Sequence, residues 1–323
     1  MVDGFINFNL NEKTPTIIKV IGVGGGGGNA VEYMYENGIC DVDFVICNTD
    51  YQALRNSPIP CKIQLGKELT AGHGAGNNPA MGEKSAQESL ADIEAILKKD
   101  TRMAFITAAM GGGTGTGAAP VIARLSKDMG ILTVGIVSVP ARFEGPKRLD
   151  QARDGLRRLK DHVDCLIVID NEKIKSIYGS QTISQAFAKA NDVLNIAAKG
   201  IAEIITLPGY INVDFADVRT VMTDSGVAIM GAAQASGEDR AIRAITEALE
   251  SPLLNNNDIL GAKDILLNIT SGTDEITMDE MSQITSHIIR KVGNNAAVIW
   301  GVGTDPDLGD AVSVTIIATG FPT

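Results

Sequence analysis

The stretch that decides the fold is residues 110–117, which read M-G-G-G-T-G-T-G. Residues 103–108 precede it as an apolar run that is typical of a buried strand. Residues 118–123 follow and predict the start of a helix, with Pro120 in its first turn. A glycine loop between a strand and a helix lets the backbone approach an anion, which the unpaired N–H groups of the first helical turn can bind. We therefore predict a phosphate-binding loop, with hydroxyl donors from Thr114 and Thr116.

A plain flexible turn is the alternative for residues 111–117, but it explains the composition less well. Five glycines in seven positions cost backbone entropy that an ordinary connection would not need. The loop is not a P-loop, because it contains no lysine and does not match G-x-x-x-x-G-K-[ST].

A second strand–glycine–helix unit lies near the start of the chain. Residues 16–21 predict a strand, residues 22–29 hold six glycines, and residues 30–34 predict a helix. The glycine spacing also fits G-x-G-x-x-G, which leaves a dinucleotide-dependent oxidoreductase as an alternative. That alternative is weakened by Asp50, which lies beyond the usual offset of about 20 residues for a ribose-binding acid. Two glycine loops in one α/β unit favour a long phosphate chain.

Further polar groups follow the other predicted strands. Residues 72–79 form a third small-residue loop, in which His73 is either a surface side chain or a catalytic base. Glu144 and Arg148 follow a buried strand and are four residues apart, so they form a surface ion pair or lie beside a sugar. Asn171 ends the last strand of this half. Because the carboxyl ends of parallel strands meet at one edge of a sheet, we expect these loops to surround one site.

A long central helix is predicted over residues 184–206, because apolar residues recur there at helical spacing. At 1.5 Å per residue it would extend for roughly 30–35 Å, enough to cross a domain. Phe187, near the start of this helix, is most simply a core residue. With Asn191 one turn further on, it also suits a base that is stacked and hydrogen-bonded.

The sequence predicts an α/β fold with two domains. An N-terminal extension (1–15) precedes a parallel-sheet domain (16–180), and the central helix (181–207) leads to a smaller α/β domain (208–323). Asp214 and Asp217 are three residues apart, so a role in capping a helix competes with a catalytic role. Other elements expected are a helix over 80–98, strands over 225–235, 264–269, 296–302 and 311–319, and helices over 238–250 and 277–292.

The composition argues against several classes of protein. The net charge of −11 argues against a nucleic-acid partner, but not against a nucleotide held by backbone N–H groups. No C-x-x-C spacing occurs and there are three histidines, so we expect no metal site built from side chains. Cys47 and Cys165 lie in apolar runs and are expected to be buried thiols in a reducing cytoplasm. We expect neither a signal peptide nor membrane insertion, because no apolar run approaches the roughly 20 residues of a membrane span.

Six motifs occur in order within residues 17–222: G-V-G-G-G-G-G-N-A, N-T-D, G-A-G-x-N-P, G-G-G-T-G-T-G, P-x-x-F-E-G-x-x-R and N-V-D-F-A-D-V-R. With these motifs the chain resembles the tubulin/FtsZ family of GTPases. The T-G-T-G ending and the N-x-D-x-x-D loop resemble the FtsZ branch rather than eukaryotic tubulin. The resemblance implies a Rossmann-like GTPase domain, a long central helix and a second, smaller α/β domain that carries the catalytic loop.

The resemblance also implies which residues bind GTP or GDP. The two glycine loops hold the phosphates, three further residues lie near the ribose and base, and two residues of the central helix read the guanine. In some relatives the last of these is Asp, and Asn can still donate to guanine O6 and accept from its ring N–H. The implied residues are Gly25, Gly26, Gly27, Gly28, Asn29, Gly112, Gly113, Thr114 and Gly115 for the phosphates, Glu144, Arg148 and Asn171 near the ribose and base, and Phe187 and Asn191 for the guanine.

Catalysis, by the same resemblance, is shared between subunits of a head-to-tail homopolymer. Asn212, Asp214 and Asp217 are implied to complete the site of the next subunit, with Mg²⁺ held through the nucleotide phosphates. The implied role is to build the bacterial division ring in the cytoplasm at mid-cell. A scaffold that binds GTP but barely hydrolyses it is the second alternative, and the two aspartates count against it.

Chains of this family usually continue into a disordered linker and a short partner-binding peptide. This sequence stops at residues 321–323, just past a predicted strand, so we expect a truncated globular core. Contacts with other cell-division proteins are then expected of the full-length form.

Overall fold

The computed structural model describes residues 16–39, 41–206, 209–211, 213–250, 259–293 and 296–321. The expected N-terminal extension, the end of the central helix at residue 207 and the predicted catalytic residue Asn212 lie outside the described residues.

The first sheet has seven parallel strands, as expected for the first domain, in the order β3-β2-β1-β4-β5-β6-β8. Its central strands are almost continuously buried, because helices cover both faces. The strand order reverses between β1 and β4, and ligands of doubly wound sheets bind at such a switch point. The strands are β1 (Ile18–Val23), β2 (Val42–Asn48), β3 (Cys61–Gln64), β4 (Met103–Ala109), β5 (Leu132–Val139), β6 (Cys165–Asp170) and β8 (Gly226–Val227).

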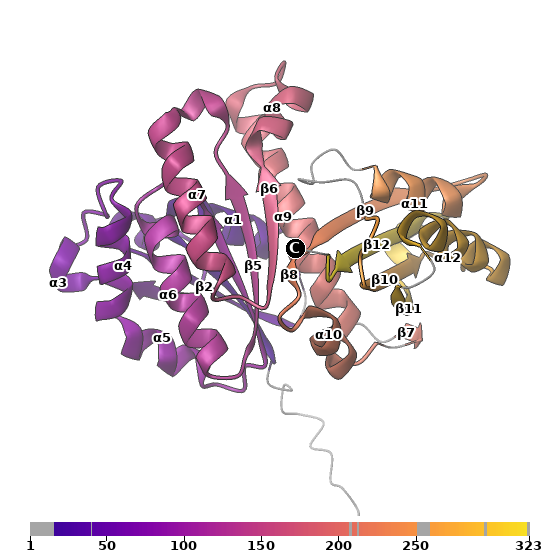
Figure 1. Cartoon of the computed structure of the whole chain (residues 1–323), viewed down its shortest axis with the longest axis horizontal. Helices are drawn as coiled ribbons and strands as arrows, with labels where there is room; N and C mark the ends of the chain where they lie inside the picture. The colour runs from indigo at the N-terminus through magenta and orange to yellow at the C-terminus, as the bar shows by residue number, and fades with distance from the viewer. Residues whose placement is uncertain are drawn as a thin grey trace, which may run out of the picture.

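Helices form a layer on each face of this sheet (Figure 1). On one face lie α1 (Gly24–Glu36) and α9 (Ile183–Thr206). On the other lie α4 (Pro79–Glu88), α5 (Leu90–Leu97), α6 (Thr114–Asp128) and α7 (Pro146–Lys160). Cys47 and Cys165 are fully buried, as predicted. The shorter elements are α2 (Tyr51–Asn56), α3 (Lys67–Thr70), the 3₁₀ turn η1 (Arg142–Glu144) and α8 (Asn171–Tyr178).

Two helices begin earlier than predicted. Helix α6 starts at Thr114, so the T-G-T-G segment is its first turn and Pro120 is interior; the prediction that Pro120 lies in the first turn was wrong. Helix α1 starts at Gly24 instead of residue 30. Glycine is a poor helix former, but packing overrides that preference here, because a Cβ at Gly27 would overlap the Thr107 carbonyl oxygen. The single helix predicted over 80–98 is also wrong: α4 and α5 are separated at Ser89.

The second sheet has five strands in the order β7-β11-β10-β12-β9 and mixed direction, with α11 and α12 packed on one face. The strand predicted over 225–235 is in fact two strands, because β8 joins the first sheet and β9 joins the second. The elements are β7 (Gly209–Ile211), α10 (Phe215–Met222), β9 (Ile229–Ala235), α11 (Arg240–Leu249), β10 (Asp264–Ser271), α12 (Met278–Val292), β11 (Ala297–Thr304), the 3₁₀ turn η2 (Pro306–Leu308) and β12 (Val312–Thr319).

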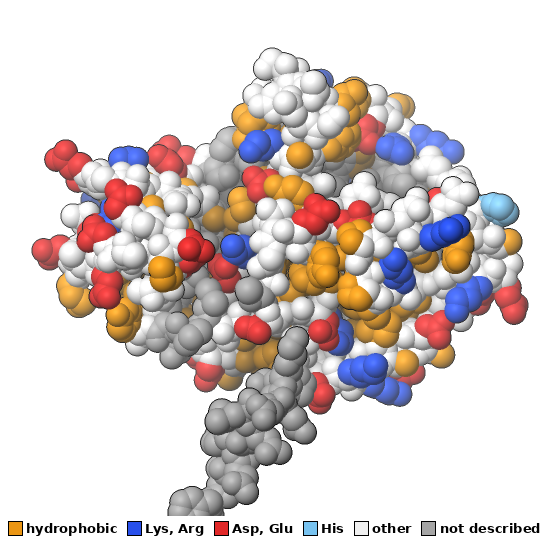
Figure 2. Space-filling model, turned by 180° about the vertical axis from the view of Figure 1, so that it is seen from behind, with side chains coloured by type: hydrophobic (Ala, Val, Ile, Leu, Met, Phe, Trp, Pro, Cys, Tyr) orange, Lys and Arg blue, Asp and Glu red, His pale blue; other side chains and the backbone are white. Residues whose placement is uncertain are grey.

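Helix α9 lies between the two sheets, within one residue of its predicted start (Figure 1). Leu194, Ala198 and Ile201 on this helix share a hydrophobic core with Leu266 and Ile317 of the second sheet. Within the described ranges, no helix is long and apolar enough to cross a membrane. On the face shown in Figure 2, acidic side chains predominate over the second domain, at the left, and basic side chains are more frequent over the first domain, at the right.

Candidate nucleotide site

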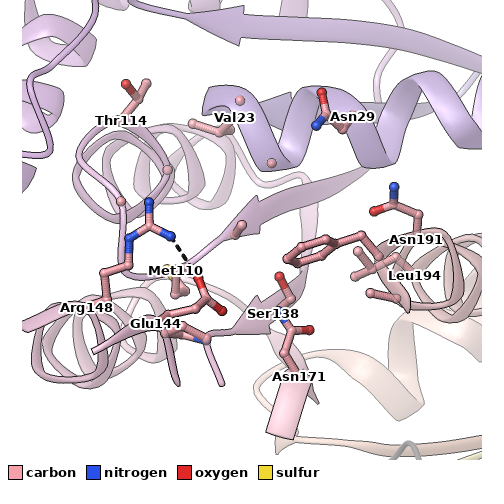
Figure 3. A pocket seen from close by; sticks show the side chains of 18 of the residues that line it. Val23, Asn29, Met110, Thr114, Ser138, Glu144, Arg148, Asn171, Asn191 and Leu194 are labelled. Atoms are coloured by element: carbon pink, nitrogen blue, oxygen red, sulfur yellow. Dashed lines mark hydrogen bonds and ion pairs between the residues drawn. The ribbon is translucent and has the colours of Figure 1, made fainter. Parts of the chain in front are cut away.

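A cavity of about 500 Å³ lies at the carboxyl ends of β1, β4 and β5, at the point where the strand order reverses. Its walls come from the first turns of α1 and α6, the segment around η1, and the N-terminal part of α9 (Figure 3). The lining residues are Val23, Gly25, Gly26, Asn29, Ala109, Met110, Gly112, Gly113, Thr114, Gly115, Ser138, Pro140, Glu144, Arg148, Asn171, Phe187, Ala190, Asn191 and Leu194.

The first turns of α1 and α6 meet at one end of this cavity. They pack backbone to backbone: a Cβ at Gly24 would lie 2.8 Å from the Gly115 nitrogen. A Cβ at Gly25 or Gly112 would instead meet nothing within 4 Å, so these glycines border open space. Two helix N-termini with unpaired N–H groups therefore converge on the cavity, and this arrangement favours an anion.

The predicted phosphate-binding residues divide into two groups. Gly25, Gly26, Asn29 and the four predicted residues of the α6 loop line the cavity. Gly27 and Gly28 do not: Gly27 is buried against β4, and Gly28 lines a neighbouring groove beside α1. Some glycines of the first loop thus face the cavity, and others allow the helix to pack on the sheet. The prediction that Thr116 donates its hydroxyl to phosphate was wrong, because Thr116 is fully buried outside the cavity and its Oγ1 accepts a hydrogen bond from the Gly111 N–H at 2.8 Å.

Glu144 and Arg148 form an ion pair of 2.8 Å between Oε2 and NH1, and both side chains line the cavity. The ion pair expected from the sequence is therefore present, and its place on the cavity wall leaves a position beside a sugar as a prediction. Glu144 is largely buried, and its Oε1 accepts a hydrogen bond from the Ala141 N–H at 3.0 Å. Its carboxylate is held in place where it can accept hydrogen bonds from sugar hydroxyls.

The opposite wall is built by α9, with Asn191 and Leu194 facing Glu144 and Arg148 across the cavity (Figure 3). Phe187 on the same helix leaves 45% of its surface exposed, which is unusual for a core residue. Asn171 lies at the start of α8, and its buried Oδ1 has no hydrogen-bond partner among the described residues. An aromatic face, a buried acceptor and a nearby amide suit a base with N–H groups at its edge.

The sequence reasoning missed several apolar lining residues. Ala190 and Leu194 lie three and seven positions after Phe187, so the helical spacing of α9 could have identified them. Met110 and Pro140 lie in motifs that the sequence singled out, whereas the polar Ser138 carries no such signal, because it reaches the cavity through the pairing of β4 with β5.

Asp214 and Asp217 do not line this cavity. Asp214 is the N-cap of α10: it accepts a hydrogen bond from the Asp217 N–H at 2.8 Å, and Asp217 accepts one from the Asp214 N–H at 3.3 Å. The predicted helix-capping role is confirmed. Between Phe187 and the last residue of α9, Thr206, the helix rises roughly 29 Å at 1.5 Å per residue, and the aspartates follow that far end.

The parallel sheet, the two convergent glycine turns and the cavity between them define a nucleotide-binding protein. Comparison with known proteins specifies the class further. The family model described as "Tubulin/FtsZ family, GTPase domain" matches residues 17–179, and the model for "FtsZ family, C-terminal domain" matches residues 226–322.

Individual relatives agree with this match. The chain is 50% identical to the cell division protein FtsZ of Porphyromonas gingivalis, over 99% of this chain and 71% of that protein. It is 48% identical to FtsZ of Coxiella burnetii, over 97% of this chain and 82% of that protein. The solved structure of an FtsZ dimer from M. jannaschii superimposes with a TM-score of 0.88 at 43% identity, covering 95% of this chain and 89% of that one. The chain belongs to the tubulin/FtsZ family of GTPases and, within it, to the FtsZ family.

Membership confirms the fold expected from the sequence and makes the chain a GTPase that binds GTP and GDP. The alternative raised by the glycine spacing, a dinucleotide-dependent oxidoreductase, is not supported by these matches.

Proposed function

We propose that this protein polymerises head to tail with GTP bound and hydrolyses the GTP where successive subunits meet, in the cytoplasmic filament of the bacterial division ring at mid-cell. The relatives named as cell division proteins and the dimeric relative from M. jannaschii support this function. The observation that carries the proposal is the separation of the cavity from Asp214 and Asp217 by most of the length of α9.

Because these aspartates cannot reach the cavity of their own chain, a catalytic role requires a second copy. Each composite site takes its glycine turns from one subunit and Asp214 and Asp217 from the next, with Asn212 beside them. Two carboxylates held permanently beside a triphosphate would repel it. Carboxylates that arrive with the neighbouring subunit can polarise the attacking water only after assembly, so hydrolysis follows polymerisation.

Within one subunit, each wall of the cavity has a separate task. The N–H groups at Gly25, Gly26, Gly112 and Gly113 bind phosphate oxygens, and Thr114 donates its hydroxyl. Glu144 accepts hydrogen bonds from the ribose, with Arg148 beside the sugar. The base-recognising residues are Asn171, which accepts from guanine N–H groups, Phe187, which stacks on the ring, and Asn191, which bonds its edge.

The proposed site also fits Mg²⁺, which proteins commonly bind through nucleotide phosphates and one or two carboxylates. Among the described residues, no cluster of three or more His, Cys, Asp or Glu could hold a metal ion alone. Thr114 and the incoming Asp214 and Asp217 are the oxygen donors that would lie beside it. When bound, the ion supplies positive charge that offsets the phosphate charge.

Exposed apolar side chains flank both halves of the proposed contact. Phe143 and Ile183, near the cavity, are 63% and 74% exposed. Tyr210 and Ile211, in the strand before the aspartates, are 70% and 42% exposed. A contact between two different surfaces of the same chain is heterologous, so it repeats without closing and generates a filament.

Mixing two inactive variants tests this function. Asp217→Asn should bind GTP but not hydrolyse it, and Gly25→Val should lose GTP while keeping its carboxylates. Sedimentation of the mixture establishes that both variants enter filaments. Hydrolysis in the co-sedimenting mixture should then exceed the sum of the two separate rates, and the absence of any gain would count against composite sites.

A further inference from the structure

Thr49 joins three loops at the phosphate end of the cavity, although it does not line the cavity itself. It lies between β2 and α2 and is fully buried. Its carbonyl oxygen accepts a hydrogen bond from the Gly74 N–H at 3.3 Å, and it also lies 3.3 Å from the Thr70 hydroxyl, whose proton it shares with the Gly66 carbonyl oxygen at 3.0 Å. Its hydroxyl oxygen lies 2.7 Å from that of Thr114, the first residue of α6. Thr49 is therefore hydrogen-bonded both to the loop that follows α3 and to the first turn of α6.

The direction of the Thr49–Thr114 hydrogen bond depends on what Thr114 faces. Either hydroxyl can donate by geometry. In the part of the chain that the structure describes, the Thr49 hydroxyl makes no other hydrogen bond, so its proton would be buried without an acceptor if Thr114 were the donor. When Thr49 donates, the Thr114 proton is free to point into the cavity, toward an anion.

We propose that Thr49 is a positioning residue for phosphate binding, acting through Thr114. The Thr49 hydroxyl donates to Thr114 Oγ1, which orients the Thr114 hydroxyl and polarises it as a donor to a phosphate oxygen. This role rests on the proposed binding of phosphate at the first turn of α6. The hydrogen bonds from Thr70 and Gly74 fix the position of Thr49, and thus link the loop around residues 72–78 to the phosphate end of the cavity.

Thr49→Val tests this role, because it removes the hydroxyl and nearly preserves the shape of the side chain. The affinities for GTP, GDP and guanosine should be measured by competition against a fluorescent GTP analogue. We expect GTP and GDP to bind about three- to tenfold more weakly, which is the range of one net hydrogen bond, while guanosine binds as in the wild type. Thr49→Ser, which keeps the donor, should restore both nucleotide affinities to within about twofold.

A double-mutant cycle separates positioning from packing. Thr114→Val should lose at least as much GTP affinity as Thr49→Val, and the double variant should lose no more than Thr114→Val alone. Additive losses, an equal loss of guanosine affinity, or no rescue by Ser would overturn the role of Thr49. If Thr49→Val does not fold, as judged by thermal unfolding, the same comparison is made between Thr49→Ala and Thr49→Ser, and equal GTP affinities overturn the proposal. Wild-type protein that binds GTP and guanosine equally would overturn the phosphate site as well.

Discussion

Asp214 and Asp217 each accept a hydrogen bond from the other's backbone N–H, at 2.8 and 3.3 Å, and so close the first turn of α10. Helix capping and the proposed catalysis therefore use the same two carboxylates. An asparagine can also accept a cap hydrogen bond, but it carries no charge. Conservative variants can thus separate the two roles.

For Asp217→Asn we expect an unfolding free energy within about 0.5 kcal/mol of the wild type, because the cap survives. GTP hydrolysis should fall by roughly a hundredfold or more, because the general base is lost. Denaturant unfolding and phosphate release measure the two effects. Asp217→Ala is the control: it should also lose the hydrogen bond that Asp217 accepts from the Asp214 N–H, and with it about 0.5–1.5 kcal/mol of stability. Wild-type hydrolysis by Asp217→Asn would leave capping as the only role.

Gly25 and Gly26 form a matched pair for the first glycine turn. A Cβ at Gly25 meets nothing, whereas a Cβ at Gly26 would overlap the Ala109 side chain. Gly25→Ala should keep or raise stability, by up to about 1 kcal/mol, because alanine is the better helix former. It should weaken GTP binding about tenfold or more by obstructing the approach of the phosphates.

Gly26→Ala should lower the unfolding free energy by about 1–3 kcal/mol, through overpacking against β4. Calorimetric GTP titration and denaturant unfolding of both variants measure the difference. Undiminished GTP affinity in Gly25→Ala would show that this glycine does not face the phosphates.

Asn191 is the residue that we expect to contribute most to the choice of base. A site built to hydrogen-bond a base discriminates strongly, because an unmatched ligand leaves buried groups unpaired. Competition binding should show that the wild type prefers GTP to ATP, and that Asn191→Leu reduces this preference by at least about tenfold. Equal competition by ATP and GTP at the wild-type site would contradict the assignment.

We expect the stability of the second domain to fall in acid, through the ion pair between Arg240 and Glu280. The buried Arg240 contacts the Glu280 carboxylate at 2.7 Å, and this hydrogen bond lowers the pKa of Glu280 to about 2. A lowered pKa in the folded state stabilises the protein above the ordinary pKa of 4.5, and that stabilisation is lost as the pH falls toward 2. The stability difference between the wild type and Glu280→Gln should therefore shrink between pH 4.5 and 2. A difference independent of pH would contradict this linkage.

The sequence predicted most of the helices and strands, because apolar spacing and the glycines between apolar runs depend on residues that are close in sequence. Residues 184–206 have unbroken helical spacing, and α9 begins within one residue of the prediction. Helix starts were less predictable, because glycine favours no single conformation. Gly24 and Gly27 pack closely on backbone that is distant in sequence, and no local pattern reveals this packing.

The other features that the sequence did not predict involve residues whose spatial neighbours are distant in sequence. Gly226 and Ile229 lie in one apolar stretch, and nothing local shows that the chain changes sheets between them. Thr49 belongs to a recognised motif, but its hydrogen bond to Thr114 spans 65 residues and needs the folded sheet. The polar residues of the site could be expected from loops that share one sheet edge, and Ala190 and Leu194 from the helical spacing of α9, whereas the place of Ser138 depended on strand pairing.

GTP turnover per molecule as a function of protein concentration tests the composite site most directly. Under the proposal that Asp214 and Asp217 act on the cavity of the next subunit, turnover should be close to zero in dilute, monomeric protein. It should rise steeply at the concentration where light scattering reports filaments, and then level off. Turnover per molecule that stays constant from the monomeric to the polymerising range would place the whole site within one chain and leave the two aspartates as helix caps.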